Sequence, residues 1–470
     1  MKLNQDIKEN SQLMNSNKSI KNLLNKRLLI VVIALILTGL GAALTGVLLK
    51  AGVYSINSFR EHLLNTGLSA FVVLPLLGGL GGLISGTLIQ NIAPAASGSG
   101  VSQIMAYLRH RPVPMGLKVG LVKLIGSIIA IGSGFPLGPE GPSVQMGGSV
   151  AWQMARWLKA PIAFRRVIVA AGGGAGIAAV FNAPIGGFIY AIEELLNSAR
   201  PLILLLVVIT TFWADAWAAV LKAITSGKLP GSFDPNIGWI IHRKYELNLD
   251  FLPTNLYYWT AIVLLGLIIG VLAEYYCKFV ITMQQQAKHI LGNNLTTKMV
   301  ASGTFLGFVY AIIHSLLHKE FHNLGGLLDE IVSGNSSSSM ALIVFIILFI
   351  STGIAAASGA PGGLFYPMLT LGAAIGFTCG DFVGNLTGHE TDIFVYAGMG
   401  SFVAACSHAP ITAMFLAFAL TKNLLVFKPI LIACITSFLV ARSFSEQSIY
   451  DRQIDIELKK PKQIELELEK

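Results

Sequence analysis

AGGGAGIAAVFNAPI, residues Ala171–Ile185, returns later in the chain as AGMGSFVAACSHAPI, residues Ala397–Ile411. The second copy begins 226 positions after the first (397 minus 171). A shorter pair, Ser133–Pro136 (SGFP) and Ser358–Pro361 (SGAP), has an offset of 225 (358 minus 133). Two blocks at nearly one offset indicate that the chain consists of two halves of one duplicated unit.

The composition of the chain is that of a membrane protein. Of its 470 residues, 54% are hydrophobic and only 12% are charged, and the mean hydropathy is +0.67. Soluble domains carry roughly a quarter charged residues. A helix that crosses a bilayer needs about 20 apolar residues. Runs of this kind open near Leu28, Gly67, Lys118, Arg166, Pro201, Tyr258, Met299, Met340 and Val426. We therefore expect an all-α polytopic membrane protein with about ten spans.

Many of these runs are interrupted by glycine or proline. The chain has 49 glycines, and small residues let membrane helices approach closely. A break within a span is tolerated only where protein or a cavity covers the freed backbone groups. Broken helices in two related halves are typical of transporters, in which the substrate site lies between the repeats near the bilayer midplane.

The polar stretches are too short for a second folded domain. We expect a tail over residues 1–27, a membrane domain over 28–450 with repeats at about 28–225 and 257–450, and a short tail over 451–470. Lysine and arginine cluster before the first apolar run, which predicts a cytoplasmic N-terminus. The formal charge of +9 does not indicate nucleic-acid binding, because the basic residues occupy tails and short loops.

Three glycine-rich strings fall at helix breaks: GSGVS at Gly98–Ser102, GPEGP at Gly138–Pro142 and GGLFYP at Gly362–Pro367. Each offers backbone N–H groups at the start of a helix, where the helix dipole adds roughly half a positive charge. We therefore expect an anion site that contains no lysine or arginine. Glu140, in the middle of GPEGP, is an acid at membrane depth, and such acids are functional by default.

These strings, in this order and with FNAPIGGFIYAIEE at Phe181–Glu194 between the second and third, resemble the CLC family of chloride channels and proton-coupled chloride antiporters. The family motifs are GSGIP, GREGP and GGIFAP. The resemblance covers about residues 28–450, and the motifs are specific as a set. It implies two inverted-topology repeats of broken and tilted helices. We expect no appended regulatory CBS domain, and in this the chain resembles prokaryotic members.

The resemblance also implies roles for individual residues. Glu140 resembles the gating glutamate, whose carboxylate competes with chloride for an anion site. Glu194 resembles the internal glutamate that passes protons from the cytoplasm in the antiporters. The chloride-binding candidates are the family serine, the tyrosine that closes the site on the cytoplasmic side, and donors of the second and third loops: Ser99, Tyr450, Gly141, Gly363, Leu364 and Phe365.

Two residues depart from the family motifs: Pro139 stands where GREGP has arginine, and Ser102 where GSGIP has proline. Both leave Glu140 and Ser99 in place, so the expected class is unchanged. Each expected role has a purely structural alternative. Glu140 could stabilise a helix start, Glu194 could be an interfacial acid, Ser99 a turn residue, and Tyr450 a member of the aromatic belt.

The sequence therefore predicts proton-coupled chloride exchange, with a passive gated chloride channel as the alternative. Bound chloride is the expected ligand, and no cofactor, metal site or enzymatic activity is expected, because no nucleotide-binding loop or hydrolase motif occurs. The resemblance implies a homodimer. We expect a bacterial inner membrane and two cytoplasmic termini.

Two features remain outside the family motifs. Asp215, in TTFWADAWAAV, is an intramembrane acid, for which we favour a polar structural partner over a proton role. His314, His318 and His322 recur at every fourth residue, so a helix would align them on one face. This spacing lacks the HExxH pattern of zinc sites, and we favour no metal there.

Overall fold

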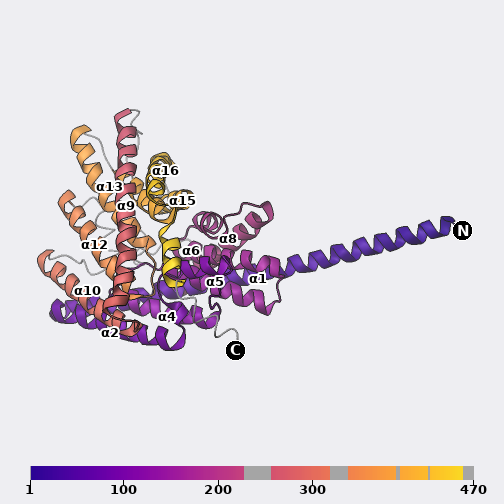
Figure 1. The fold of residues 1–470 in the computed structure, drawn as a ribbon, viewed down its shortest axis with the longest axis horizontal. Coiled ribbons are helices and arrows are strands. Elements are labelled where there is room, and N and C mark those ends of the chain that lie inside the picture. The colour runs from indigo at the N-terminus through magenta and orange to yellow at the C-terminus, as the bar shows by residue number, and fades with distance from the viewer. Residues whose placement is uncertain (1, 227–255, 318–336, 388–391, 422–423, 459–470) are drawn as a thin grey trace.

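The chain folds into a bundle of α-helices of very different lengths (Figure 1). The computed structural model describes residues 2–226, 256–317, 337–387, 392–421 and 424–458. Within these ranges, nine helices are long and apolar enough to cross a membrane. The prediction of an all-α polytopic membrane protein is confirmed.

The first half of the chain runs from the amino terminus to residue 226. Its helices are α1 (Lys2–Asn65), α2 (Ala70–Ile92), α3 (Val101–Leu108), α4 (Leu117–Ser133), α5 (Glu140–Trp157), α6 (Ile162–Phe181), α7 (Pro184–Tyr190) and α8 (Pro201–Ser226), with a 3₁₀ turn η1 (Pro94–Ala96) and a π-helical turn η2 (Ala191–Leu196). The apolar span of α1 begins at Arg27, and Figure 1 shows the amino-terminal part of this helix extending away from the bundle.

The second half repeats this plan from residue 256 onward. Its helices are α9 (Leu256–Ile290), α10 (Leu295–Leu317), α12 (Ser338–Ser358), α13 (Phe365–Thr387), α14 (Asp392–Ser407), α15 (Pro410–Thr421), α16 (Phe427–Phe444) and α17 (Ile449–Leu458), with a 3₁₀ turn η3 (Leu424–Val426). The boundary expected at residue 450 falls inside α17.

Backbone geometry follows the repeat offset. Gly134 and Gly359, which occupy equivalent positions of the two halves, both end a helix with positive φ, at 118° and 79°. Asn182 and His408, a second equivalent pair, do the same at 51° and 60°. Non-glycine residues seldom adopt this left-handed conformation, so its recurrence at equivalent positions shows that both halves break their helices in the same way.

The set of spans differs from the expected one at two places. Phe365–Leu386 is long and apolar enough to cross a membrane, although no span was predicted there, because its glycines, threonines and Asp381 lower the mean hydropathy to 1.2. Within its most apolar segment, 61% of the residues are buried inside the protein. Most of this helix therefore faces other helices rather than lipid and can carry polar residues. Conversely, the apolar run expected near Lys118 forms α4, whose 17 residues are fewer than the about 20 that a membrane-crossing helix needs.

The two halves pack closely where glycine removes the side chain. Gly78 of α2 and Gly303 of α10 lie so close that a Cβ on either would collide with the backbone carbonyl of the other. Helices α7 and α15 also contact each other, as do α5 and α13. These contacts place the helix breaks of both halves in the centre of the molecule.

Candidate functional site

The second and third glycine-rich strings are hydrogen-bonded to each other. The Gly138 N–H donates to the Gly363 carbonyl at 2.8 Å, and the Gly363 N–H donates to the Gly138 carbonyl at 2.7 Å. Gly138 and Gly363 are 225 positions apart (363 minus 138), which is the offset between the two halves. Each therefore bonds to the residue at the equivalent position of the other half. A reciprocal bond between equivalent residues lies on the axis that relates the two halves. The strings therefore meet on the pseudo-twofold axis of the fold.

The first string joins this junction from the side. The Gly98 N–H donates to the Gly359 carbonyl at 3.0 Å, and the Gly98 carbonyl accepts from the Gly362 N–H at 3.3 Å. A Cβ added to Gly141 would collide with the carbonyl oxygen of Ser99 and lie 2.9 Å from the Gly363 Cα. All three strings are thus in contact, as the sequence predicts for one composite site.

Three helices begin at this junction: α3 at Val101, α5 at Glu140 and α13 at Phe365. The first N–H groups of a helix have no partner within the helix, and they carry the positive end of its dipole. Three such ends in one buried place favour an anion.

The Glu140 carboxylate lies at this junction. Its side chain is 1% exposed, and its Oε1 accepts the Tyr366 N–H at 3.0 Å. A Cβ added to Gly138 or to Gly363 would collide with the carboxylate. Oε2 has no hydrogen-bond partner in the part of the chain that the structure describes. The carboxylate therefore occupies the N-terminus of α13, in a position that an exchangeable anion could use.

A buried lysine outside the three strings supports the first of them. Lys123 lies in α4 and is 0% exposed. Its Nζ donates to the Ala96 carbonyl at 3.1 Å and to the Gly98 carbonyl at 2.5 Å. The Lys123 amino group thus bonds to the residue that directly precedes Ser99. The signal in the sequence was a lone lysine inside an apolar run, LKVGLVKLIGSIIAIGS, where an unpaired charge would be costly.

Ser99 and Tyr450 are both buried, at 5% and 2% exposure. The Ser99 Oγ accepts the Val101 N–H at 3.3 Å, so its hydroxyl oxygen stays at the start of α3. Tyr450 lies in the first turn of α17, which packs against α3. The phenol of Tyr450 is close enough to Glu140 and Glu194 for electrostatic interaction.

Helix α17 is fixed by ion pairs of the two residues that follow Tyr450. Asp451 pairs with Arg109 at the end of α3 at 2.5 Å. Arg452 pairs with Glu274 of α9 at 2.6 Å, with Glu274 nearly buried. These bonds hold the start of α17 against α3, the helix that follows the first string, and against α9.

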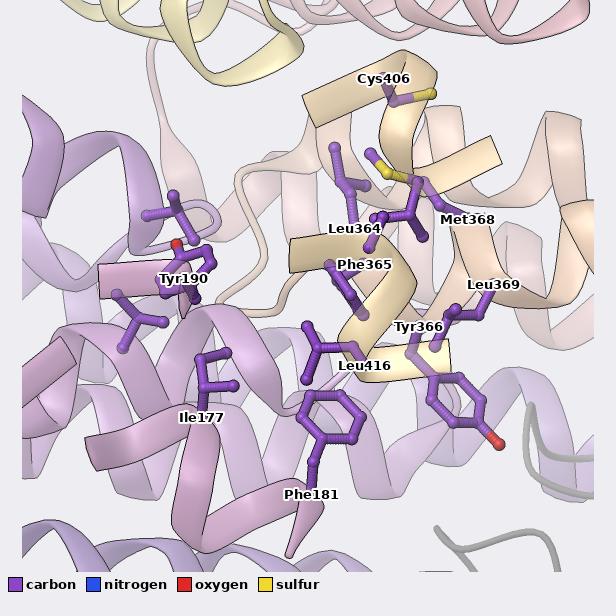
Figure 2. Close-up of a cluster of buried hydrophobic side chains, with 14 of the residues drawn as sticks. Ile177, Phe181, Tyr190, Leu364, Phe365, Tyr366, Met368, Leu369, Cys406 and Leu416 are labelled. Atoms are coloured by element: carbon purple, nitrogen blue, oxygen red, sulfur yellow. The ribbon is translucent and has the colours of Figure 1, made fainter. Parts of the chain in front are cut away.

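The third string places its side chains in an apolar cluster rather than toward solvent. Leu364 and Phe365 are 1% and 3% exposed, and the Phe365 ring lies 5.7 Å from that of Phe181. Figure 2 shows these residues with Ile177 and Tyr190 around the start of α13. Bulk water is therefore largely excluded from this side of the junction, which strengthens electrostatic interactions within it.

Comparison with known proteins identifies the family. The family described as voltage gated chloride channel matches residues 81–442, most of the chain. The chain belongs to this CLC family. The H(+)/Cl(-) exchange transporter ClcA of Vibrio parahaemolyticus is 31% identical over 382 residues, covering 80% of this chain and 78% of ClcA. ClcA of Yersinia pestis is 31% identical over 372 residues, covering 77% and 73%.

Solved structures agree with the fold. The crystal structure of a slow cyanobacterial Cl-/H+ antiporter superposes with a TM-score of 0.80 at 26% identity, covering 92% of this chain and 98% of that one. A eukaryotic CLC transporter has a TM-score of 0.75 at 20% identity, covering 92% of this chain and 74% of that one. The predicted CLC fold is confirmed.

The two departures from the CLC motifs occupy ordinary helix starts. Pro139 is the N-cap of α5, with φ of −79°, a value that proline adopts readily. Ser102 is the second residue of α3, and its Oγ donates to Gln103 Oε1 at 3.1 Å. Neither residue disturbs the junction of the three strings.

The two adjacent glutamates of the CLC stretch have different surroundings. Glu193 caps the start of α15: its carboxylate accepts the Ile411 N–H at 3.1 Å, the Thr412 N–H at 2.6 Å and the Thr412 hydroxyl at 2.7 Å. Glu194 is 7% exposed and lies close enough to Asp451, Glu193 and Arg109 for electrostatic interaction. Adjacent residues of a helical turn point in different directions, so the two neighbours in η2 have different partners.

Asp215 has two lysines as electrostatic partners. Lys50 of α1 and Lys222 of α8 both interact with its charge. Lys222 also donates to Asn182 Oδ1 at 2.6 Å. Lys50 is 2% exposed. Asp215 therefore has the polar partners that a structural role requires. The proposed histidine stripe cannot be placed, because His318 and His322 lie outside the described residues.

We expect Asp215→Asn to lower the free energy of unfolding by about 1 to 3 kcal/mol, because it removes the negative charge between two lysines. The measurement is thermal unfolding in detergent. Proton coupling in the same variant should match the wild type. A variant of normal stability that loses coupling would assign Asp215 to the proton path instead.

Proposed function

We propose that the protein exchanges chloride for protons across a membrane, as the names of its relatives suggest. The observation that carries the proposal is the Glu140 carboxylate at the N-terminus of α13, where it accepts the Tyr366 N–H at 3.0 Å. A carboxylate in that position excludes chloride from the same N–H groups. Protonation removes its charge, so the side chain leaves and chloride can enter.

This competition links the two ions. Because chloride and the Glu140 carboxylate favour the same positive region, occupancy by one lowers the affinity for the other. Chloride binding thus favours the protonated side chain, and the proton travels opposite to chloride when Glu140 returns. Ser99 and Tyr450 would bind chloride from the cytoplasmic side, and Gly141, Gly363, Leu364 and Phe365 would supply the walls and backbone donors of the pathway.

The proton needs its own entry from the cytoplasm, which we assign to Glu194. It is buried, it lies near the ion pair of Arg109 and Asp451, and it interacts electrostatically with Tyr450. Glu193, by contrast, uses both carboxylate oxygens to cap α15. The two glutamates therefore provide a matched pair for a test.

The first experiment measures proton movement in proteoliposomes loaded with high chloride and diluted into low chloride at equal pH. Chloride leaving the liposomes should drive protons inward against their own gradient. The uptake should persist when potassium and an ionophore hold the voltage near zero, because voltage then cannot drive a passive proton leak. Chloride exit without proton movement would instead assign the protein as a gated channel.

We expect Glu194→Gln to abolish proton uptake in this assay and to leave chloride flux. Glu193→Gln, the matched control, should keep coupling, because its amide oxygen can still accept a hydrogen bond from the first N–H groups of α15. We expect this variant to lower the free energy of unfolding by about 1 kcal/mol. If Glu193→Gln uncouples transport and Glu194→Gln does not, the assignment of the proton acceptor is reversed.

We also propose a bacterial inner membrane and a homodimer, each subunit with its own pathway. Both termini would lie in the cytoplasm, as the basic residues before the first span favour. Chemical crosslinking in membranes checks the dimer, and labelling of cysteines added to either terminus in intact cells checks the orientation.

A further inference from the structure

Tyr190 carries a buried hydroxyl that the anion site does not use. It is the last residue of α7 and is 4% exposed. Among the described residues its hydroxyl has no hydrogen-bond partner. Leaving a buried polar group unsatisfied costs about 1 to 3 kcal/mol, and phenylalanine would fill the same space without that cost. A bound water or a functional role can account for such a hydroxyl.

Tyr190 lies in the same buried region as the two carboxylates of the proposed exchange. Tyr190 is close enough to Tyr450, Glu194 and Glu140 for electrostatic interaction with all three. It also directly precedes η2, the turn that carries Glu194. Tyr190 therefore adjoins the turn of Glu194, and Figure 2 places it near the start of α13, where the Glu140 carboxylate lies.

The space around Tyr190 is otherwise apolar. Figure 2 shows it in one cluster with Phe365, Leu416 and Ile177. None of these three side chains can accept or donate a proton. A proton that crosses this cluster has to use water, a hydroxyl, or both.

On the basis of the proposed exchange, we infer that the Tyr190 hydroxyl relays protons between Glu194 and Glu140, with a water molecule on each side. A phenol donates and accepts at the same time. A proton arriving on one water forms a new bond to Oη while the original Oη–H bond breaks toward the other water. The tyrosine stays neutral, and one proton has moved with no change in electron count.

This route is separate from the anion path. Chloride would meet backbone N–H groups, Ser99 and Tyr450, whereas the proton would pass on the α7 side of the cluster. Removing the hydroxyl should therefore change the number of protons carried per chloride, a quantity that general damage to the fold would not change selectively.

The test uses Tyr190→Phe in the full-length protein, with chloride and proton fluxes recorded together in proteoliposomes. We expect proton flux to fall about tenfold, equivalent to about 1.4 kcal/mol at the barrier, and chloride flux to fall much less. Equal losses of both fluxes, or an unchanged proton-to-chloride ratio, would overturn the relay.

Tyr258→Phe is the matched control. Tyr258 of α9 also has a mostly buried ring and a hydroxyl without a partner among the described residues, and its ring packs 5.3 Å from Phe394. We expect its proton-to-chloride ratio to equal that of the wild type. A ratio lowered as much as in Tyr190→Phe would show that any lost buried phenol uncouples transport.

The relay and the exchange fail in different ways. If the wild type moves no protons, the proposed exchange fails and the relay with it. If the wild type is coupled, Glu194→Gln is uncoupled, and Tyr190→Phe keeps the wild-type ratio, the exchange stands and the relay is wrong.

Discussion

Glu140→Ala is expected to conduct chloride without protons and without a response to pH. The variant removes the carboxylate that competes with chloride at the N-terminus of α13, where Oε1 accepts the Tyr366 N–H. It also removes the group whose protonation would link the two ions. Proton uptake should fall to the level of protein-free liposomes, and chloride flux should be equal at acidic and neutral pH.

Glu140→Gln separates charge from size in the same assay. The amide keeps the volume of the side chain and resembles the protonated acid, so we expect it to conduct chloride with no proton uptake as well. A chloride flux that remains steeply pH-dependent in both variants would assign the pH response to another group. Loss of all chloride flux in well-folded Glu140→Ala would exclude the gating role.

Much of the architecture could be predicted because the chain repeats itself. The nearly constant offset between the repeated blocks predicted two equivalent halves, and the positive φ of Asn182 and His408 recurs at that offset. The sequence could not predict that Gly138 and Gly363 bond to each other. Glycine has no side chain to mark a contact, and pairing across the axis depends on how the two halves pack.

The candidate site was predicted less completely than the fold. Lys123 was missed because only the loops were expected to form the anion site, whereas its Nζ reaches the first string from the middle of α4. The different surroundings of Glu193 and Glu194 could not be predicted from the residues alone. The sequence shows only two adjacent acids and does not indicate which residues of other helices each of them contacts. The turn η2 and the start of α15 determine which acid becomes a cap. Tyr190 had no signal at all in a stretch of apolar and aromatic residues.

Gly141→Ala is expected to abolish transport by separating the strings that form the junction. A Cβ at this position would collide with the Ser99 carbonyl oxygen and lie 2.9 Å from the Gly363 Cα. Both neighbours are backbone atoms, which cannot rotate away as a side chain can. We expect a loss of about 3 kcal/mol in stability and chloride flux below detection in proteoliposomes.

Gly148→Ala is the control on the same helix. Its Cβ would meet the terminal methyl group of Ile104, and a side-chain end can change rotamer at small cost. Both variants gain the same helix propensity, about 1 kcal/mol for alanine over glycine. The difference between them therefore isolates the backbone collision at the junction. Normal chloride flux in Gly141→Ala would mean that the three strings tolerate separation, and the anion pathway would have to lie elsewhere.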